Sequence, residues 1–198
     1  PNGKKISIML EEIKFDYKIT KVYINKGEQF EPKFRSLSPF SKIPVIIDHD
    51  NNVSMFESGA ILMYLGDKSK KFYPEKNRNL INQWLMGQMA YVGPLLGQHH
   101  QFHHYNPGKS DWGEDRYFKI AKSIYKDLDE RLEKNEFLAK DYSIADIATF
   151  PWIARHDWHD IGLKNFKNLT RWYKTISNRE AVIKGYDLLK RDEKIPPP

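Results

Sequence analysis

The 198-residue sequence contains no cysteine. Without cysteine the chain forms no disulfide, gives no thiolate ligand to a metal and has no thiol nucleophile of its own. The sequence also has no signal-peptide pattern and no apolar run near the roughly 20 residues that are needed to cross a bilayer. We therefore expect a soluble, cytoplasmic protein that does not bind membranes.

The sequence has no concentrated block of charge either. Its formal net charge is +6, but the lysines are spread along the chain. A basic chain can bind nucleic acid or acidic ligands, and nucleic-acid binders usually gather their basic residues in one region. We expect no nucleic-acid partner, although the surface would attract small anions. Hydrophobic residues make up 40% of the chain, which is enough for a packed core.

The first third of the chain alternates between helical and strand-like spacing. We predict a helix over 5–14, a strand over 17–24, a loop over 27–30, a short helix or turn over 31–37, strands over 45–48 and 53–56 joined by a turn, and a helix over 57–67. A helix between two strands usually serves a parallel crossover, which needs a strand before the first helix. The sequence begins without methionine and runs almost at once into a helix, so we expect that about eight residues precede Pro1 in the full protein.

The rest of the chain is predicted to be helical. Residues 69–77 are polar and contain a proline, which is typical of a linker. Helical stripes follow over 80–102 with a kink at Gly93-Pro94, over 114–134, from Ser143, over 166–176 and over 182–189, with a loose tail at 195–198. Asp146 stands at the third position of the helix that Ser143 opens. We therefore assign it a structural role, in which it caps the helix and holds the neighbouring loop. The predicted domains are 1–68 and 78–198.

Two short stretches point to a binding site for a peptide with a charged end. Pro44 stands directly at the entry to an apolar strand, where it leaves the backbone N–H and C=O of Ile43 free to pair with an extended peptide. We expect the Ile43-Pro44 bond to be cis, and a simple trans turn is the alternative. Glu57 and Ser58 then open a helix, and the N–H groups of a helix start favour a carboxylate.

The combination of Ser-Lys-Ile-Pro at 41–44, Glu-Ser-Gly-Ala at 57–60 and Ser-Ile-Ala-Asp at 143–146 resembles the glutathione transferases over nearly the whole chain. The finer resemblance is to their bacterial Nu class. It is carried by Pro1-Asn2-Gly3, Gly27-Glu28-Gln29-Phe30 and Gly93-Pro94-Leu95-Leu96-Gly97-Gln98-His99-His100. The threonine that precedes the proline in that class lies outside the sequence.

This resemblance implies an α+β protein. Its N-terminal domain would be thioredoxin-like, with the first strand absent from the sequence, and its C-terminal domain all-α. The resemblance also implies a homodimer that binds glutathione or glutathione disulfide, uses glutathione as substrate or co-substrate, and needs no metal. The activity implied is glutathione-dependent reduction of disulfides.

The resemblance further assigns roles at the predicted peptide site. Asn2 would be the catalytic residue, because its side-chain N–H₂ could donate to the glutathione sulfur at a helix start and lower the thiol pKa. A plain helix cap is the alternative role for Asn2. Ile43 would pair with the cysteinyl part of glutathione and Pro44 would shape the loop.

The γ-glutamyl end of glutathione would be held by Glu57 and Ser58. Glu57 would take the ammonium group and Ser58 the carboxylate, whereas the alternative for Glu57 is a surface acid at a helix start. Gln29 and Lys42 would reach the glycyl end or the backbone of glutathione. A solvated surface lysine is an equal alternative for Lys42.

A second group of residues would face the second substrate or the dimer partner. It comprises Gln98, His99, Phe102 and Arg116. For Arg116 the alternative is a surface pair with Asp115 or another neighbour. The histidines at 99, 100, 103 and 104 form i,i+4 pairs that would suit zinc. No carboxylate or cysteine nearby completes a ligand set, so we expect no metal site.

The lack of cysteine decides how disulfide chemistry would run. The chain cannot form a mixed disulfide with its substrate, so exchange must run between a glutathione thiolate and the substrate directly. The same site would also suit addition of glutathione to an electrophile. A non-catalytic glutathione-binding or scaffold protein is the alternative.

Overall fold

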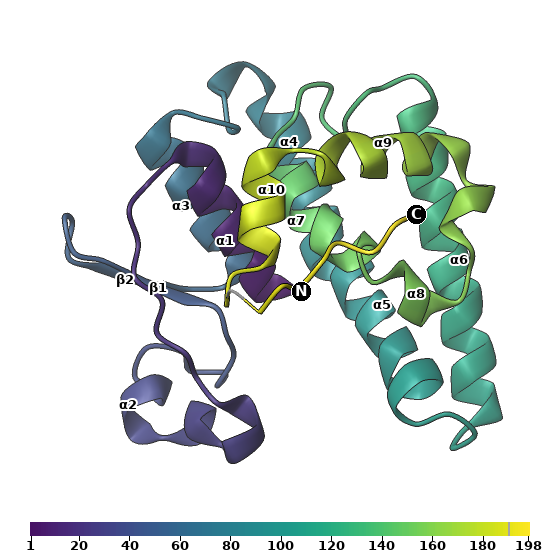
Figure 1. Cartoon of the computed structure of the whole chain (residues 1–198), viewed down its shortest axis with the longest axis horizontal. Helices are drawn as coiled ribbons and strands as arrows, with labels where there is room; N and C mark the ends of the chain where they lie inside the picture. The colour runs from purple at the N-terminus through teal and green to yellow at the C-terminus, as the bar shows by residue number, and fades with distance from the viewer. Residues whose placement is uncertain (190) are drawn as a thin grey trace.

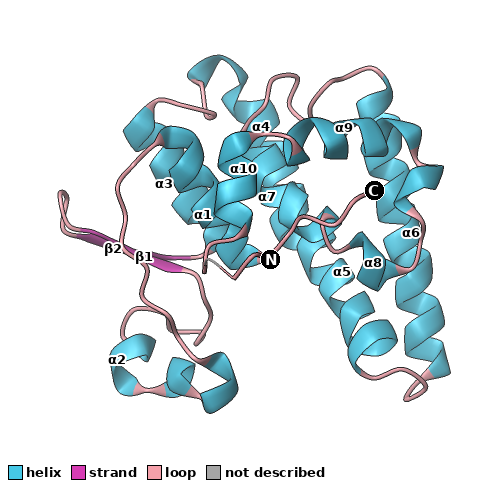
Figure 2. Ribbon diagram, viewed as in Figure 1, coloured by secondary structure: helices cyan, strands magenta, loops and turns pink. Residues whose placement is uncertain are grey.

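The computed structural model describes residues 1–189 and 191–198. Figures 1 and 2 show a small two-stranded sheet and a lobe of short helical turns on one side, and a larger set of helices on the other. None of the helices in these ranges is long and apolar enough to cross a membrane. The α+β class and the all-helical second half are confirmed.

The N-terminal part is built from α1 (Asn2–Ile13), α2 (Pro32–Arg35), β1 (Val45–Asp48), β2 (Val53–Phe56) and α3 (Ser58–Ser69), with 3-10 turns at Ile24–Lys26 and Glu28–Phe30. These bounds confirm the three predicted helices and both strands of the hairpin. The predicted strand over 17–24 is wrong. Within the described residues β1 and β2 pair with each other alone, so the segment has no partner for a ladder, and most of its side chains are exposed.

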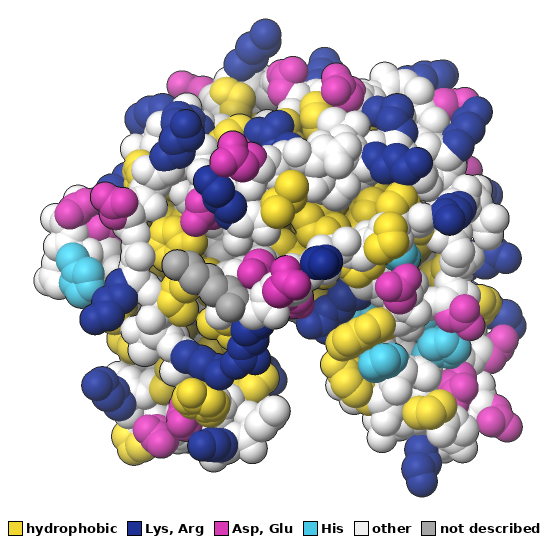
Figure 3. All heavy atoms as spheres, viewed as in Figure 1, with side chains coloured by type: hydrophobic (Ala, Val, Ile, Leu, Met, Phe, Trp, Pro, Cys, Tyr) yellow, Lys and Arg dark blue, Asp and Glu magenta, His cyan; other side chains and the backbone are white. Residues whose placement is uncertain are grey.

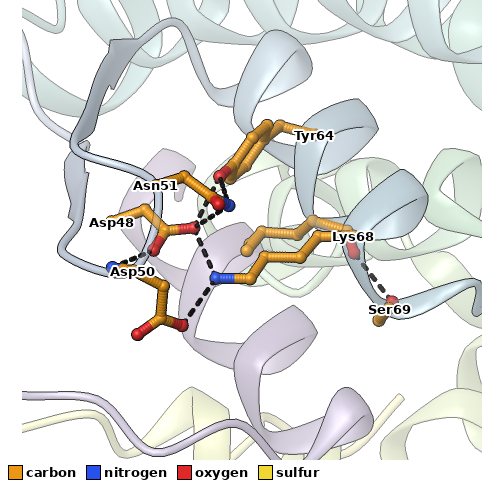
Figure 4. Close-up of polar contacts among 7 residues, drawn as sticks. Asp48, Asp50, Asn51, Tyr64, Lys68 and Ser69 are labelled. Carbon is orange, nitrogen blue, oxygen red and sulfur yellow. Dashed lines mark hydrogen bonds and ion pairs between the residues drawn. The ribbon is translucent and has the colours of Figure 1, made fainter.

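The hairpin is fastened to α3 by a polar cluster, which Figure 4 shows. Asp48, at the end of β1, accepts hydrogen bonds from the Tyr64 hydroxyl at 2.5 Å and from Lys68 Nζ at 2.6 Å. Lys68 also reaches Asp50 in the turn at 3.0 Å. These contacts hold the turn end of the hairpin against α3. The start of α3 is therefore fixed relative to the loop that precedes β1.

The C-terminal part contains α4 (Arg78–Gly87), a π-helical turn η4 (Gln88–Val92), α5 (Gly93–His99), a second π-helical turn η5 (His100–Tyr105), α6 (Asp111–Glu133), α7 (Ile144–Ile153), α8 (His156–His159), α9 (Lys167–Ser177) and α10 (Glu180–Tyr186). The predicted helix over 80–102 is therefore one helical run with two wide turns, one of which lies directly before Gly93-Pro94. Wide turns of this kind often mark functional regions.

α7 is the centre of the molecule, and each of its ten residues is buried. Its start is closed by the predicted capping box, in which Asp146 Oδ2 accepts from Ser143 N at 3.1 Å. Asp146 Oδ1 also accepts from Leu138 N at 3.0 Å and from Trp172 Nε1 at 2.8 Å. The structural role predicted for Asp146 is confirmed.

α1 joins the two parts, because it packs against α3 on one side and against α7 and α10 on the other (Figure 1). A Cβ at Gly185 of α10 would lie 2.5 Å from the Ile8 Cα, so glycine is needed for this close approach. The C-terminal tail is not loose as predicted. Ile195 packs against the core, and Tyr173 donates to the Pro196 carbonyl at 2.7 Å.

Candidate functional site

The surface is deeply hollowed between two lobes. Figure 3 shows this hollow between the lobe that carries α2 and the lobe formed by the ends of α5 and α6, and Figure 1 places the start of α1 at its head. Lysine and arginine side chains gather on the α2 side, and apolar and histidine side chains lie on the opposite wall.

Asn2 lies in the first turn of α1, where Pro1 is the capping residue and no side-chain cap bond is formed. The structure thus does not use Asn2 as a plain helix cap. Its side-chain Oδ1 accepts a hydrogen bond from the indole Nε1–H of Trp152 at 3.2 Å. Because an indole N–H can only donate, this contact turns the amide oxygen toward Trp152 and leaves the N–H₂ free to donate elsewhere.

Trp152 is held in a slot made by small residues of α5. A Cβ at Gly93 would lie 3.3 Å from the indole ring, and one at Gly97 would lie 3.4 Å from it. The His100 ring stacks on the indole with 5.9 Å between centroids and 12° between planes. The spacing of the two glycines is therefore explained by the indole that packs over them.

The loop before β1 is shaped by the buried hydroxyl of Ser38. It donates to the Lys42 carbonyl at 2.8 Å and accepts from the Lys42 N–H at 3.0 Å. The Ile43-Pro44 bond is cis, as predicted. Ile43 is 40% exposed, and in the part of the chain that the structure describes its backbone N–H and C=O make no hydrogen bond with the protein backbone. An open backbone edge is present where the sequence predicts one.

Glu57 and Ser58 connect β2 to α3 through a strained turn. Glu57 has φ 66° and ψ 111°, a left-handed conformation that L-residues rarely adopt. Its side chain is exposed, whereas Ser58 is 3% exposed at the first position of α3. The turn separates the pair, with the acid in solvent and the hydroxyl against the protein.

Behind Ser58 lies Lys5, which the sequence analysis did not single out. Lys5 is 1% exposed, and its Nζ donates to Ser58 Oγ at 3.3 Å and to Gln88 Oε1 at 2.6 Å. Burial lowers the pKa of Lys5 to about 7, and the Glu57 carboxylate opposes this effect. A signal was available, because Lys5 stands three and four residues before Ile8 and Met9 and so shares their buried face.

The two remaining residues predicted for the glutathione-binding group lie on or near the α2 lobe. Gln29 is in the 3-10 turn Glu28–Phe30, and its side-chain Oε1 is buried without a hydrogen-bond partner in the described chain. Lys42 is exposed directly before Ile43. Lys42 therefore adjoins Ile43 and Pro44 in one loop, and Gln29 lies in a separate 3-10 turn.

Of the residues predicted for the second-substrate side, Gln98 is exposed on α5, and Phe102 stacks on Tyr117 with 5.2 Å between ring centroids. Arg116 is exposed and lies 5.5 Å from the centre of the Trp112 ring. The alternative pair between Arg116 and Asp115 is not formed, since Asp115 pairs with Lys119 at 2.7 Å.

Comparison with known proteins identifies the family. Residues 1–67 match the glutathione S-transferase N-terminal domain and residues 114–180 match the glutathione S-transferase C-terminal domain. The disulfide-bond oxidoreductase YfcG of Escherichia coli (strain K12) is 40% identical, and the alignment covers 96% of this chain and 91% of that protein. The chain belongs to the glutathione transferase family.

Solved structures agree with this assignment. A glutathione transferase from Burkholderia graminis with two glutathione molecules bound per subunit is 38% identical, with a TM-score of 0.90 and coverage of 96% of this chain and 85% of that chain. One from Pseudomonas putida with one glutathione disulfide bound per subunit is 39% identical, with a TM-score of 0.88 and coverage of 98% and 88%. The predicted thioredoxin-like N-terminal domain and helical C-terminal domain are confirmed.

One residue that was predicted for the second-substrate side of this glutathione transferase is fully buried. His99 is 0% exposed, and its Nε2 lies 2.8 Å from the His159 carbonyl, to which it donates. This position does not fit the direct contact with a second substrate that the sequence predicts. The helical stripe through this region turns His99 inward, whereas Gln98 faces solvent.

The neighbouring histidines of the glutathione transferase form a buried chain. His100 Nε2 lies 2.8 Å from His159 Nε2, and His159 Nδ1 lies 2.6 Å from the Tyr125 hydroxyl. Burial lowers the pKa of His100 to about 3 and that of His159 well below its usual value. Among residues 1–189 and 191–198 no three His, Asp or Glu side chains are grouped to hold a metal ion. These imidazoles are neutral and fill the helical core.

Proposed function

We propose that this glutathione transferase reduces small disulfides and takes its reacting thiol from bound glutathione. The proposal is carried by the similarity to a disulfide-bond oxidoreductase over 96% of the chain. It is supported by related structures that hold two glutathiones or one glutathione disulfide per subunit. Because this chain has no cysteine, the reacting thiol must come from glutathione.

The proposed reaction balances with two glutathiones. The thiolate of the first attacks one sulfur of the substrate disulfide, the disulfide bond breaks, and the leaving thiolate takes a proton. The second glutathione then attacks the glutathione sulfur of the mixed disulfide, which releases the second substrate thiol and glutathione disulfide. The substrate gains two electrons and two protons, and the two glutathiones lose them.

The residues in the hollow supply position and charge for this exchange. Asn2 donates its free N–H₂ to the thiolate, and the open backbone of Ile43 next to Pro44 pairs with the cysteinyl residue. Ser58 binds the γ-glutamyl carboxylate and Glu57 the γ-glutamyl ammonium group.

Other residues complete the two binding sites. Gln29 and Lys42 contribute at the glycyl end of the first glutathione. Gln98, Phe102 and Arg116 line the side of the second glutathione, where the Arg116 guanidinium suits a carboxylate.

We further propose the setting in which the enzyme works. The chain acts as a homodimer in the cytoplasm, where glutathione keeps thiols reduced. Its glutathione-binding domain spans 1–68, a linker follows over 69–77, and the helical domain spans 78–198. Addition of glutathione to electrophiles is a second activity that the same thiolate would support.

Two measurements test the function. Calorimetric titration with glutathione and with glutathione disulfide is expected to show binding of both, and a coupled assay with hydroxyethyl disulfide is expected to show turnover. Tight binding without turnover on any small disulfide would remove the reductase and leave a glutathione-binding module. Failure to bind either ligand would remove the glutathione site altogether.

A further inference from the structure

A half-buried arginine stands at the end of α7. Arg155 follows Ala154, the C-cap residue of this helix, and its guanidinium lies 4.3 Å from the centre of the Trp158 ring. Among residues 1–189 and 191–198 the Arg155 side chain forms no hydrogen bond and no ion pair, unlike Arg78 and Arg179, which each hold a carboxylate. All five N–H donors of its guanidinium are therefore available to a ligand.

Arg155 lines a pocket of about 180 Å³ between the end of α7 and the C-terminal tail. The wall of this pocket also includes Trp158 and Tyr186, the last residue of α10. Tyr186 belongs as well to a second pocket of about 190 Å³, which Gly3 of α1 lines. The two pockets therefore adjoin at Tyr186, beside the first turn of α1, which carries Asn2.

The other charged groups of the Arg155 pocket have partners of their own. The three contacts are Glu193 with Lys4 at 2.6 Å, Asp157 with His156 at 3.0 Å and Lys194 with Asp192 at 3.9 Å. Arg155 is the cation of this pocket that has no such contact in the described chain. A half-buried guanidinium has lost part of its hydration, and a carboxylate that accepts its N–H groups would restore those hydrogen bonds.

The guanidinium also lies close to the amide that is proposed to hold the thiolate. The Arg155 backbone N–H donates to the Trp152 carbonyl at 3.2 Å, so Arg155 stands one helical turn beyond the residue that contacts Asn2. Side chains three positions apart on a helix have Cβ atoms about 5–6 Å apart. Burial and, after it, the Arg155 guanidinium lower the pKa of His100 to about 3, and the His100 ring stacks on Trp152.

We propose that Arg155 selects disulfide substrates that carry a carboxylate a few bonds from the sulfur, by pairing with that carboxylate in this pocket. The inference rests on the proposed function, because it takes the reacting sulfur to lie beside Asn2. A guanidinium fits a carboxylate through two parallel hydrogen bonds, and the flat Trp158 ring supports the guanidinium plane.

The chemistry stays that of the proposed reaction. The substrate S–S bond breaks and the S–S bond of glutathione disulfide forms. The two glutathiones lose two electrons and two protons, and the substrate gains them and leaves as two thiols that each keep their carboxylate. Arg155 takes no part in the electron transfer and acts on substrate binding alone.

The test compares three disulfides of similar length on four proteins. 3,3′-Dithiodipropionate carries a carboxylate on each arm, hydroxyethyl disulfide is neutral, and cystamine carries an ammonium group on each arm. The proteins are the intact chain, Arg155→Met, Arg155→Gln and Lys174→Met. Lys174 is an exposed cation on α9, so its variant controls for the loss of one positive charge. kcat and KM for each disulfide are measured at neutral pH and saturating glutathione.

We expect the intact chain to reduce 3,3′-dithiodipropionate with a kcat/KM roughly 10-fold above that for hydroxyethyl disulfide, through a lower KM, since one charged hydrogen-bonded pair is gained. Cystamine should be the poorest of the three substrates. Arg155→Met should bring the ratio between the first two substrates to about one and should improve cystamine relative to both. Lys174→Met should keep the ratio of the intact chain.

Arg155→Gln also removes the charge and suits a half-exposed position, so it gives the same test if Arg155→Met fails to fold. A ratio near one in the intact chain, or an unchanged ratio in the Arg155 variants, would overturn the inference and leave the proposed function in place. A higher KM for glutathione with all three disulfides alike would overturn it too, because Arg155 would then serve glutathione. If the intact chain reduces none of the disulfides, the proposed function fails and the inference fails with it.

Discussion

The indole N–H of Trp152 and the side-chain oxygen of Asn2 lie 3.2 Å apart although 150 positions separate them in the sequence. One residue belongs to the buried central helix α7 and the other to the first turn of α1. The helical domain therefore sets the orientation of an amide in the thioredoxin-like domain. Since the amide has one oxygen and one N–H₂ group, fixing the oxygen also fixes where the donor points.

Trp152→Phe should weaken the reaction without emptying the site. Phenylalanine keeps an aromatic ring over Gly93 and Gly97 but removes the donor, so the Asn2 amide can rotate and offer its oxygen to the thiolate. We expect the pKa of bound glutathione to rise by about one unit, or ~1.4 kcal/mol, and turnover at neutral pH to fall roughly 10-fold. Thiolate ultraviolet absorbance against pH measures the first effect and the disulfide assay the second.

The control for this variant is Trp158→Phe. Trp158 stacks on His104 with 4.1 Å between ring centroids and, like Trp152, lies against the His100 ring. Its removal should leave the thiol pKa where it was. An unchanged thiol pKa in Trp152→Phe would show that the indole has no part in orienting Asn2.

Asn2→Ala should lower turnover far more than it lowers glutathione affinity, because the lost donor acts mainly on the thiolate. Asn2→Asp is the sharper variant, since a carboxylate still accepts from Trp152 but has no N–H₂ and repels the thiolate. We expect Asn2→Asp to be the slower of the two by at least about 10-fold. Steady-state kinetics with varied glutathione separates turnover from affinity. Unaltered turnover in Asn2→Ala would remove Asn2 from the catalytic role.

The parts of this fold that the sequence predicts are those fixed by short-range chemistry. The hairpin over 45–56 follows from two apolar runs around a polar turn, and the capping box at Ser143 follows from a local pattern. A proline directly before β1 predicts the open backbone of Ile43 and is compatible with the cis bond that the structure shows before Pro44.

What the sequence does not predict depends on partners far along the chain. The segment 17–24 has strand-like alternation, but a strand needs a neighbour, and none is present in the residues that the structure describes. The contact between Trp152 and Asn2 and the burial of Lys5 arise only when α1, α7 and η4 meet. The position of Lys5 on an apolar helix face could have predicted that it is buried. It could not have predicted which residues it contacts.

Asp146→Asn should destabilise the protein by roughly 2–4 kcal/mol. The two carboxylate oxygens accept four hydrogen bonds, two from Ser143 and one each from Leu138 and Trp172. Asparagine keeps one oxygen and adds two donors, so buried donors would face each other. Urea unfolding followed by circular dichroism measures the loss. The control is Asp127→Asn, because Asp127 is an exposed acid. Equal stability of both variants would contradict the structural role of Asp146.

The buried imidazoles predict how stability depends on pH. The pKa of His100 is lowered to about 3 by burial, whereas an unfolded histidine has a pKa of about 6.5. Below about pH 6.5 the unfolded chain therefore binds a proton at His100 that the folded chain does not bind. The contribution of His100 to stability is present above that pH and falls as the pH drops.

His100→Gln isolates this contribution. Between about pH 6.5 and pH 5, each such histidine costs up to ~1.4 kcal/mol of unfolding free energy per pH unit. The variant should therefore lose stability less steeply than the intact protein, by about that slope, in urea titrations across this window. The control is His49→Gln, which should keep the original slope because this side chain is exposed on the hairpin turn. Parallel curves for the intact protein and His100→Gln would mean that His100 is already protonated in the folded core.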